Sequence, residues 1–65
     1  MQEYHPGYKQ EIRELLESRP GEWMSESEIA VILSYPISTI QYAVMRMHDV
    51  REEYRDGILY CKLME

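Results

Sequence analysis

The sequence predicts a small α+β domain in which three helices are followed by a C-terminal β-hairpin. Apolar residues recur at helical spacing in three stretches before Asp49, and they alternate with polar residues after it. Asp56-Gly57 favours a two-residue hairpin turn, because both positions accept the positive φ that such a turn requires. A chain of 65 residues has room for one core, so we expect a single domain over residues 1–65.

The first helix is predicted over about residues 8–18. Its apolar residues fall on one stripe: Tyr8, Ile12, Leu15 and Leu16. Pro20-Gly21 ends it, because proline disfavours helical geometry in the preceding residue and glycine permits a reversal.

The second helix is predicted over residues 26–33. Ser25 followed by Glu28 has the spacing of a capping box, which marks a helix start. The preceding Glu22-Trp23-Met24 is too short for a helix and favours a small strand, with Trp23 expected to anchor in the core.

The third helix is predicted over about residues 37–48, after a break at Ser34-Tyr35-Pro36. Pro36 suits the first turn of a helix, where a missing amide hydrogen costs nothing. Ile40, Val44 and Met47 repeat at helical spacing and should face the core.

The hairpin is predicted over about residues 50–64. Counting outward from Asp56-Gly57 pairs Val50 with Leu63 and Glu52 with Cys61. The predicted core face consists of Val50, Tyr54, Leu59, Cys61 and Leu63. The opposite face consists of Arg51, Glu53, Arg55, Tyr60 and Lys62.

Three helices and a terminal hairpin follow the order of a winged helix-turn-helix domain. The stretch from Ile29-Ala30 through Leu33, Ser34-Tyr35-Pro36 and Ser38-Thr39-Ile40 to Val44–Met47 resembles the helix-turn-helix of bacterial GntR-like and MarR-like regulators. It departs from them at Ser34, where those families commonly have glycine. The resemblance implies the winged-helix fold more specifically than it implies a function, because winged helices bind both DNA and protein.

Composition narrows the classes of function. Twelve acids against seven lysines and arginines give a net charge of -5, the sign opposite to a usual DNA-binding footprint. A lone cysteine, no secretory signal pattern and no membrane-length apolar run indicate a cytoplasmic protein without a membrane partner. We expect no enzyme, catalytic residue, cofactor or metal site, because the sequence shows no phosphate-binding glycine loop, nucleophile–base pair or ligand spacing.

The preferred hypothesis is a small transcriptional regulator that inserts its third helix into the major groove of double-stranded DNA. The candidate DNA contacts are Ser38, Thr39, Gln41 and Tyr42, with Arg46, Arg51 and Arg55 on the phosphate backbone. Because these bases are few, we expect a homodimer that doubles them. The small size suggests a phage or other mobile-element protein.

The alternative is a winged helix that binds a protein partner as an adaptor or inhibitor. Its candidate interface is apolar, formed by Ile37, Tyr42 and Met45 and assisted by the acidic front half of the chain. A third possibility is that the third helix only packs and its exposed apolar residues are incidental.

Overall fold

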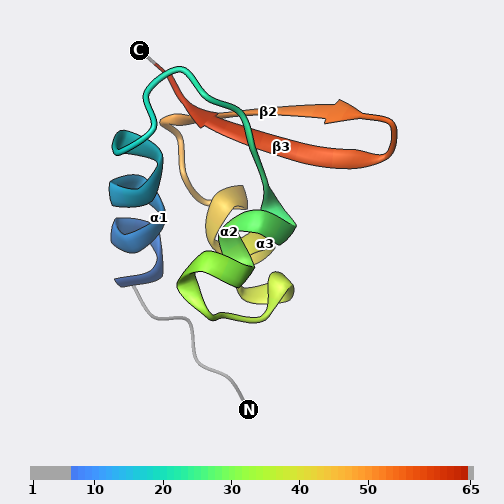
Figure 1. Cartoon of the computed structure of the whole chain (residues 1–65). Helices are drawn as coiled ribbons and strands as arrows, with labels where there is room; N and C mark the ends of the chain where they lie inside the picture. Colours follow the sequence, from blue (N-terminus) through green and yellow to red (C-terminus); the bar gives the residue numbers. More distant parts are fainter. Residues whose placement is uncertain (1–6, 65) are drawn as a thin grey trace.

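The computed structural model describes residues 7–64 and places three helices on one face of a three-stranded antiparallel sheet (Figure 1). The elements in chain order are α1 (Gly7–Glu17), β1 (Met24–Ser25), α2 (Glu26–Leu33), α3 (Ile37–Met45), β2 (Val50–Arg55) and β3 (Ile58–Leu63). The predicted α+β class is confirmed. The sheet order is β1-β3-β2, so β2 lies at an edge.

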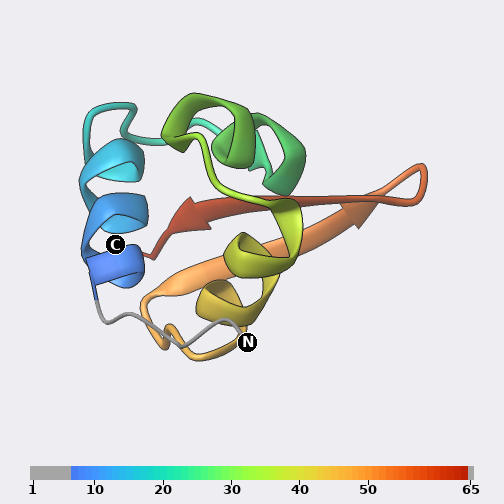
Figure 2. The ribbon, with the colours of Figure 1, turned by 90° about the horizontal axis from the view of Figure 1, so that it is seen from below.

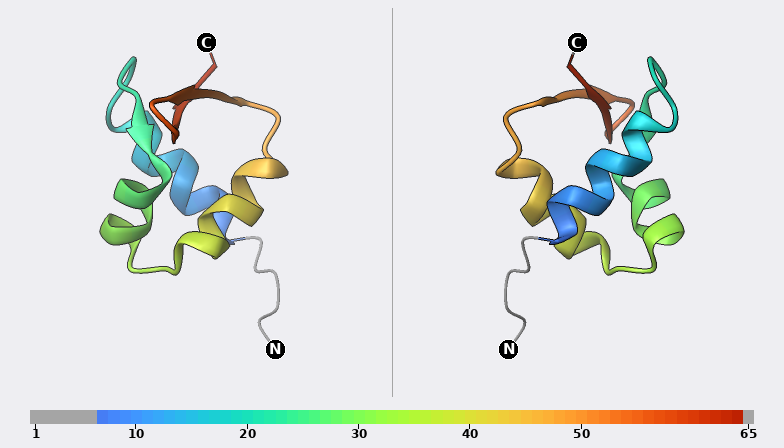
Figure 3. Two further views of the ribbon diagram at one scale, coloured as in Figure 1. Left: turned by 90° about the vertical axis from the view of Figure 1, so that its right-hand side faces the viewer. Right: turned by 90° about the vertical axis from the view of Figure 1, so that its left-hand side faces the viewer.

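Helix α1 buries the stripe that its sequence predicts. Ile12 and Leu16 are buried, and Tyr8 and Leu15 pack against the same core. The helix ends at Glu17, where the Ser18 hydroxyl donates to the Leu15 carbonyl at 2.6 Å. In Figure 3, α1 runs between α2 and α3, and it packs against both of them.

Helix α2 is capped at both ends. Ser25 Oγ accepts a hydrogen bond from the Glu28 amide at 3.0 Å, which is the first half of the predicted capping box. The Glu28 carboxylate lies 3.7 Å from the Arg19 guanidinium. At the other end Ser34 adopts the left-handed conformation with φ 62°, and its amide bonds back to the last turn.

Helix α3 ends at Met45, three residues before the predicted His48. The amides of Arg46 and Met47 bond to the carbonyls of Ala43 and Val44, each at 3.0 Å, which tightens the last turn. This turn directs Met47 into the core, where it is 6% exposed. The helix was predicted to continue past Met45 because Met47 keeps the apolar spacing, but Met47 lies in the loop after α3 and its side chain still points into the core.

The hairpin has the predicted register, with Val50 opposite Leu63 and Glu52 opposite Cys61. Asp56 and Gly57 both have positive φ, as the two-residue turn requires. The prediction that Tyr54 belongs to the core is wrong: it lies on the inward side of β2, but its side chain is 73% exposed. The tip of the hairpin extends past the helices, so its inward side has no core to meet (Figures 1 and 2).

Strand β1 pairs Met24 with Cys61 and Ser25 with Tyr60. It ends at Ser25, one residue after the end of the predicted strand 22–24. Met24 is buried, whereas Trp23 is half-buried and lies outside the core cluster. The expectation that Trp23 anchors the core is therefore wrong: Met24 enters the core, whereas Trp23, directly before β1, lies against Arg55 and Lys62.

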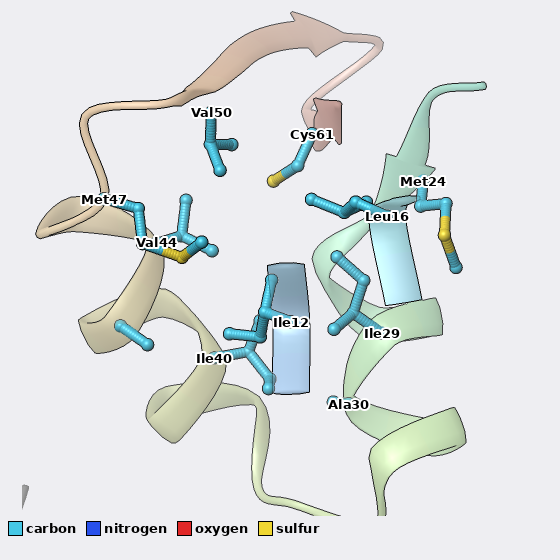
Figure 4. Close-up of a cluster of buried hydrophobic side chains, with 11 residues drawn as sticks. Ile12, Leu16, Met24, Ile29, Ala30, Ile40, Val44, Met47, Val50 and Cys61 are labelled. Atoms are coloured by element: carbon cyan, nitrogen blue, oxygen red, sulfur yellow. The ribbon is translucent and has the colours of Figure 1, made fainter. Parts of the chain in front are cut away.

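The core is one cluster to which every element contributes (Figure 4). Val50 and Cys61 project from the sheet toward side chains of the three helices. Burying these apolar groups supplies the main stabilisation of so short a chain. Arg13 on α1 also donates to both carboxylate oxygens of Asp49, at 2.7 and 3.2 Å, and so ties α1 to the loop before β2.

Candidate nucleic-acid interface

Helices α2 and α3 are joined by three residues, and the chain bends by 116° between them. Tyr35 in this turn is held from two sides. Its hydroxyl donates to Glu11 at 2.5 Å, and its ring meets Tyr8 edge to face with centroids 4.7 Å apart. The left-handed Ser34 and the anchored Tyr35 together set the direction in which α3 leaves the turn.

Helix α3 divides into a buried and an exposed face. Ile40, Ala43 and Val44 are buried. The exposed residues of the helix are Ile37, Ser38, Gln41, Tyr42 and Met45. Acidic residues are absent from the whole span 37–48, so a negatively charged ligand would meet no carboxylate on the helix itself.

Thr39 is the one candidate DNA contact on α3 that the structure buries, with 7% of its surface exposed. It lies one turn before Ala43, which is fully buried, so both side chains face inward. The expectation that Thr39 contacts DNA is therefore corrected: its methyl and hydroxyl groups are not presented to a ligand.

Arg46 is exposed just beyond α3 and is held against Tyr42. Its guanidinium carbon lies 3.7 Å from the centre of the Tyr42 ring, within cation–π range. Its Nη1 also donates to the Tyr42 carbonyl at 3.5 Å. This contact orders a positive charge at the end of the exposed face.

A groove of about 220 Å³ separates the start of α3 from the hairpin tip. It is lined by Glu26, Ser27, Ile37, Gln41, Tyr54, Gly57, Ile58 and Leu59. Glu26 is 5% exposed, and burial raises the pKa of its carboxyl group, while a hydrogen bond with Gln41 opposes the shift. Gln41 is thus exposed but already engaged by a buried acid, which its sequence context does not reveal.

Arg51 and Arg55, the candidate phosphate contacts on the hairpin, lie on the sheet face that points away from the helices. Val50 projects into the core, so the alternating positions 51, 53 and 55 point the other way. The structure therefore brings Ser38, Gln41, Tyr42 and Arg46 together near α3 and leaves Arg51 and Arg55 on a separate surface.

The apolar candidates for a protein interface are all on the surface. Ile37, Tyr42 and Met45 are 43%, 42% and 74% exposed. The groove adds Tyr54 and Ile58 beside Ile37, an extension that sequence analysis missed because Tyr54 was assigned to the core.

Other kinds of site find little support in residues 7–64. No group of three or more histidine, cysteine, aspartate or glutamate side chains there is arranged to hold a metal ion. Burial raises the pKa of the Cys61 thiol to about 12, so this buried cysteine stays protonated and unreactive at neutral pH. No single helix in this range is long and apolar enough to cross a membrane. Helices α2 and α3 taken together have the length and apolar composition of a membrane span, but the chain bends sharply between them.

Comparisons with known protein families, with curated proteins and with solved structures find no match to this chain.

Proposed function

We propose that this chain is a DNA-binding winged-helix protein, a small cytoplasmic transcriptional regulator that places α3 in the major groove of double-stranded DNA. The observation that carries the proposal is the pair α2 and α3: a three-residue turn, a bend of 116° and an exposed second helix without acid. Helix-turn-helix motifs have angles of roughly 90–120° and turns of this length. The hairpin then takes the position of the wing.

The exposed polar groups on α3 suit a mixture of base and phosphate contacts. Ser38 lies in the first turn, where hydroxyl groups commonly bond phosphates. Gln41 can pair with an adenine edge once it releases Glu26. Arg46, ordered against Tyr42, is placed to contact a phosphate.

Charge limits the affinity of a single copy. Arg46 is the only basic residue between Ile37 and His48, and the carboxyl group of Glu26 lies beside Gln41. Each phosphate neutralised contributes about 0.9 to the slope of log affinity against log salt. A homodimer would double this small contribution, and we include it in the proposal.

The test is a titration of a random-sequence DNA duplex at low and at moderate salt. We expect binding at low salt that weakens as salt rises, and further weakening by Arg46→Gln. The matched control is Lys9→Gln, which removes one charge from α1. A complete lack of duplex binding at low salt would refute the proposal.

A second candidate function, capture of a protein partner, is favoured by one observation. The apolar residues Ile37, Tyr42 and Met45 are exposed together on α3, and the groove beside Ile37 continues the apolar surface. Tyr42→Ala combined with Met45→Ala should abolish partner capture. Under the DNA proposal Met45→Ala alone should retain most of the duplex affinity, because Met45 carries no charge and, unlike Tyr42, does not hold Arg46 in place.

A further inference from the structure

The outer face of the sheet carries a surface that α3 does not share. The side chains that point away from the core are Trp23, Arg51, Glu53, Arg55, Tyr60 and Lys62. This set is called the outer sheet face below. It holds three of the chain's seven basic residues and one acid.

Cations and aromatic rings alternate across the outer sheet face. Trp23 contacts two positive groups, since Lys62 Nζ and the Arg55 guanidinium carbon each lie 5.1 Å from its ring centre. Arg55 also lies 5.6 Å from the centre of the Tyr60 ring. The order Lys62, Trp23, Arg55, Tyr60 is thus a row of cation–π contacts. Lys62 and Tyr60 lie on β3, Arg55 lies at the end of β2 and Trp23 directly precedes β1.

Two positive charges on this face have no acid opposite them. Arg51 pairs directly with Lys62 across β2 and β3, an arrangement that is destabilising for like charges. Glu53 instead forms an ion pair with Arg55 at 2.5 Å. The face therefore carries a local excess of positive charge in a protein of net charge -5.

We propose that the outer sheet face binds single-stranded nucleic acid. Its phosphates would lie against Arg51 and Lys62, and its bases would stack on the row formed by Trp23, Arg55 and Tyr60. Single-strand binding combines a positive track for the backbone with rings or guanidinium planes for the bases, and both features occur here on one open face.

The same chemistry disfavours the other anionic partners. A duplex keeps its base faces stacked inside the helix, so it would use the positive charges and leave the rings without a partner. The carboxylates of an acidic peptide could also contact Arg51 and Lys62, but they have no flat ring to stack on Trp23 or Tyr60. A single strand is the ligand that engages both kinds of side chain.

The chain contains one tryptophan, so tryptophan fluorescence reports on Trp23 in the outer sheet face alone. We would titrate the protein with an oligothymidylate of about 15 nucleotides at low salt and follow Trp23 quenching. The expected result is saturable quenching that weakens as salt rises. The proposal would be overturned if the oligothymidylate did not quench Trp23 and if the fluorescence anisotropy of a labelled oligonucleotide also showed no binding.

Variants separate this surface from α3. Arg51→Gln with Lys62→Gln should weaken oligothymidylate binding by about tenfold and reduce the salt slope by about 1.4, the value for two single-strand phosphate contacts. Tyr60→Leu should weaken it by about fivefold through lost stacking. The matched control, Lys9→Gln with Arg19→Gln, removes two charges elsewhere and should have a small effect.

Two further measurements decide between partners and between proposals. If a poly-glutamate peptide bound as tightly as the oligonucleotide, and Tyr60→Leu weakened the binding of neither ligand, the partner would be an acidic protein and the proposal would be overturned. Gln41→Ala should leave oligothymidylate binding unchanged while weakening duplex binding. Loss of both by Gln41→Ala would mean that α3 is the only nucleic-acid surface.

Discussion

The exposed face of α3 and the outer sheet face differ in how their charge is arranged. Between residues 37 and 48 acid is absent but Arg46 is the only lysine or arginine, and Gln41 forms a hydrogen bond with the buried carboxyl group of Glu26. The outer sheet face includes Glu53, yet Arg51, Arg55 and Lys62 leave it positive. An acidic chain can therefore still present a positive surface, because strand alternation collects its few bases on one side.

The largest expected effect tests whether the two surfaces depend on one core. Ile40→Ala should destabilise the fold by about 3 kcal/mol, because a fully buried side chain is replaced by a cavity. Urea unfolding followed by circular dichroism would measure it, and both surfaces should be lost in one transition. Ile37→Ala, on the exposed side of the same helix, should change stability by only about 0.5 kcal/mol. A hairpin that stays folded in Ile40→Ala would show that the surfaces are independent.

A smaller effect should come from the ion pair that ties α1 to the loop between the two surfaces. Hydrogen bonds from Arg13 lower the pKa of Asp49. The ion pair therefore contributes stability above the unfolded-state pKa of aspartate, and the contribution is lost as pH falls through the lowered pKa. Both side chains are partly exposed, so screening limits the contribution to about 0.5–1 kcal/mol.

Asp49→Asn should remove that contribution at neutral pH. It should also make the free energy of unfolding less dependent on pH in the acid range where Asp49 titrates. Urea unfolding midpoints across the acid range would measure both effects. Asp56→Asn, at the hairpin tip, is the matched control, and an unaltered pH dependence in Asp49→Asn would contradict the assignment.

Ser34→Gly should raise the stability of the fold through the turn that precedes α3. Ser34 holds the left-handed conformation at the end of α2, where glycine has no steric penalty. We expect a gain of about 0.5–1 kcal/mol in the free energy of unfolding. Ser27→Gly, inside α2, should instead lose about 0.5 kcal/mol. Equal effects of the two substitutions in thermal melts would argue against a strained turn.

The smallest expected effect concerns Glu26 below Gln41. Burial raises the pKa of this carboxyl group, so the folded state holds its proton more tightly than the unfolded state. Stability therefore falls as pH rises from the ordinary glutamate pKa through the raised one. Glu26→Gln should gain about 0.5 kcal/mol at neutral pH and lose that advantage in acid. It should also strengthen duplex binding, and unchanged stability at both pH values would refute the role of burial.

Prediction from sequence succeeded where a local pattern had a single physical solution. The Asp56-Gly57 turn set the register of the hairpin, and the Ser25 cap marked the start of α2. It failed where a pattern needed a neighbour to complete it. Tyr54 occupies an inward position on β2, but the hairpin is longer than the core beneath it.

The candidate site shows the same division. Exposure of Ser38, Gln41, Tyr42 and Met45 followed from the inward stripe of α3, because helical geometry relates the two faces. Burial of Thr39 did not follow from it, because a residue at the edge of the stripe is covered only if neighbouring elements reach it. The contacts of Gln41 with Glu26 and of Arg55 with Trp23 join separate elements, and no local spacing predicts them.

Residues close together in the chain fix the three helices, the hairpin register and the absence of acid between residues 37 and 48. How these parts combine depends on contacts between elements that are distant in the chain. Those contacts put Arg51 and Arg55 on the opposite side of the sheet from α3, leave Trp23 on the outer sheet face and join Glu26 to Gln41 by a hydrogen bond. Local rules assign a side chain to a face, whereas the packing of one element on another decides which faces meet.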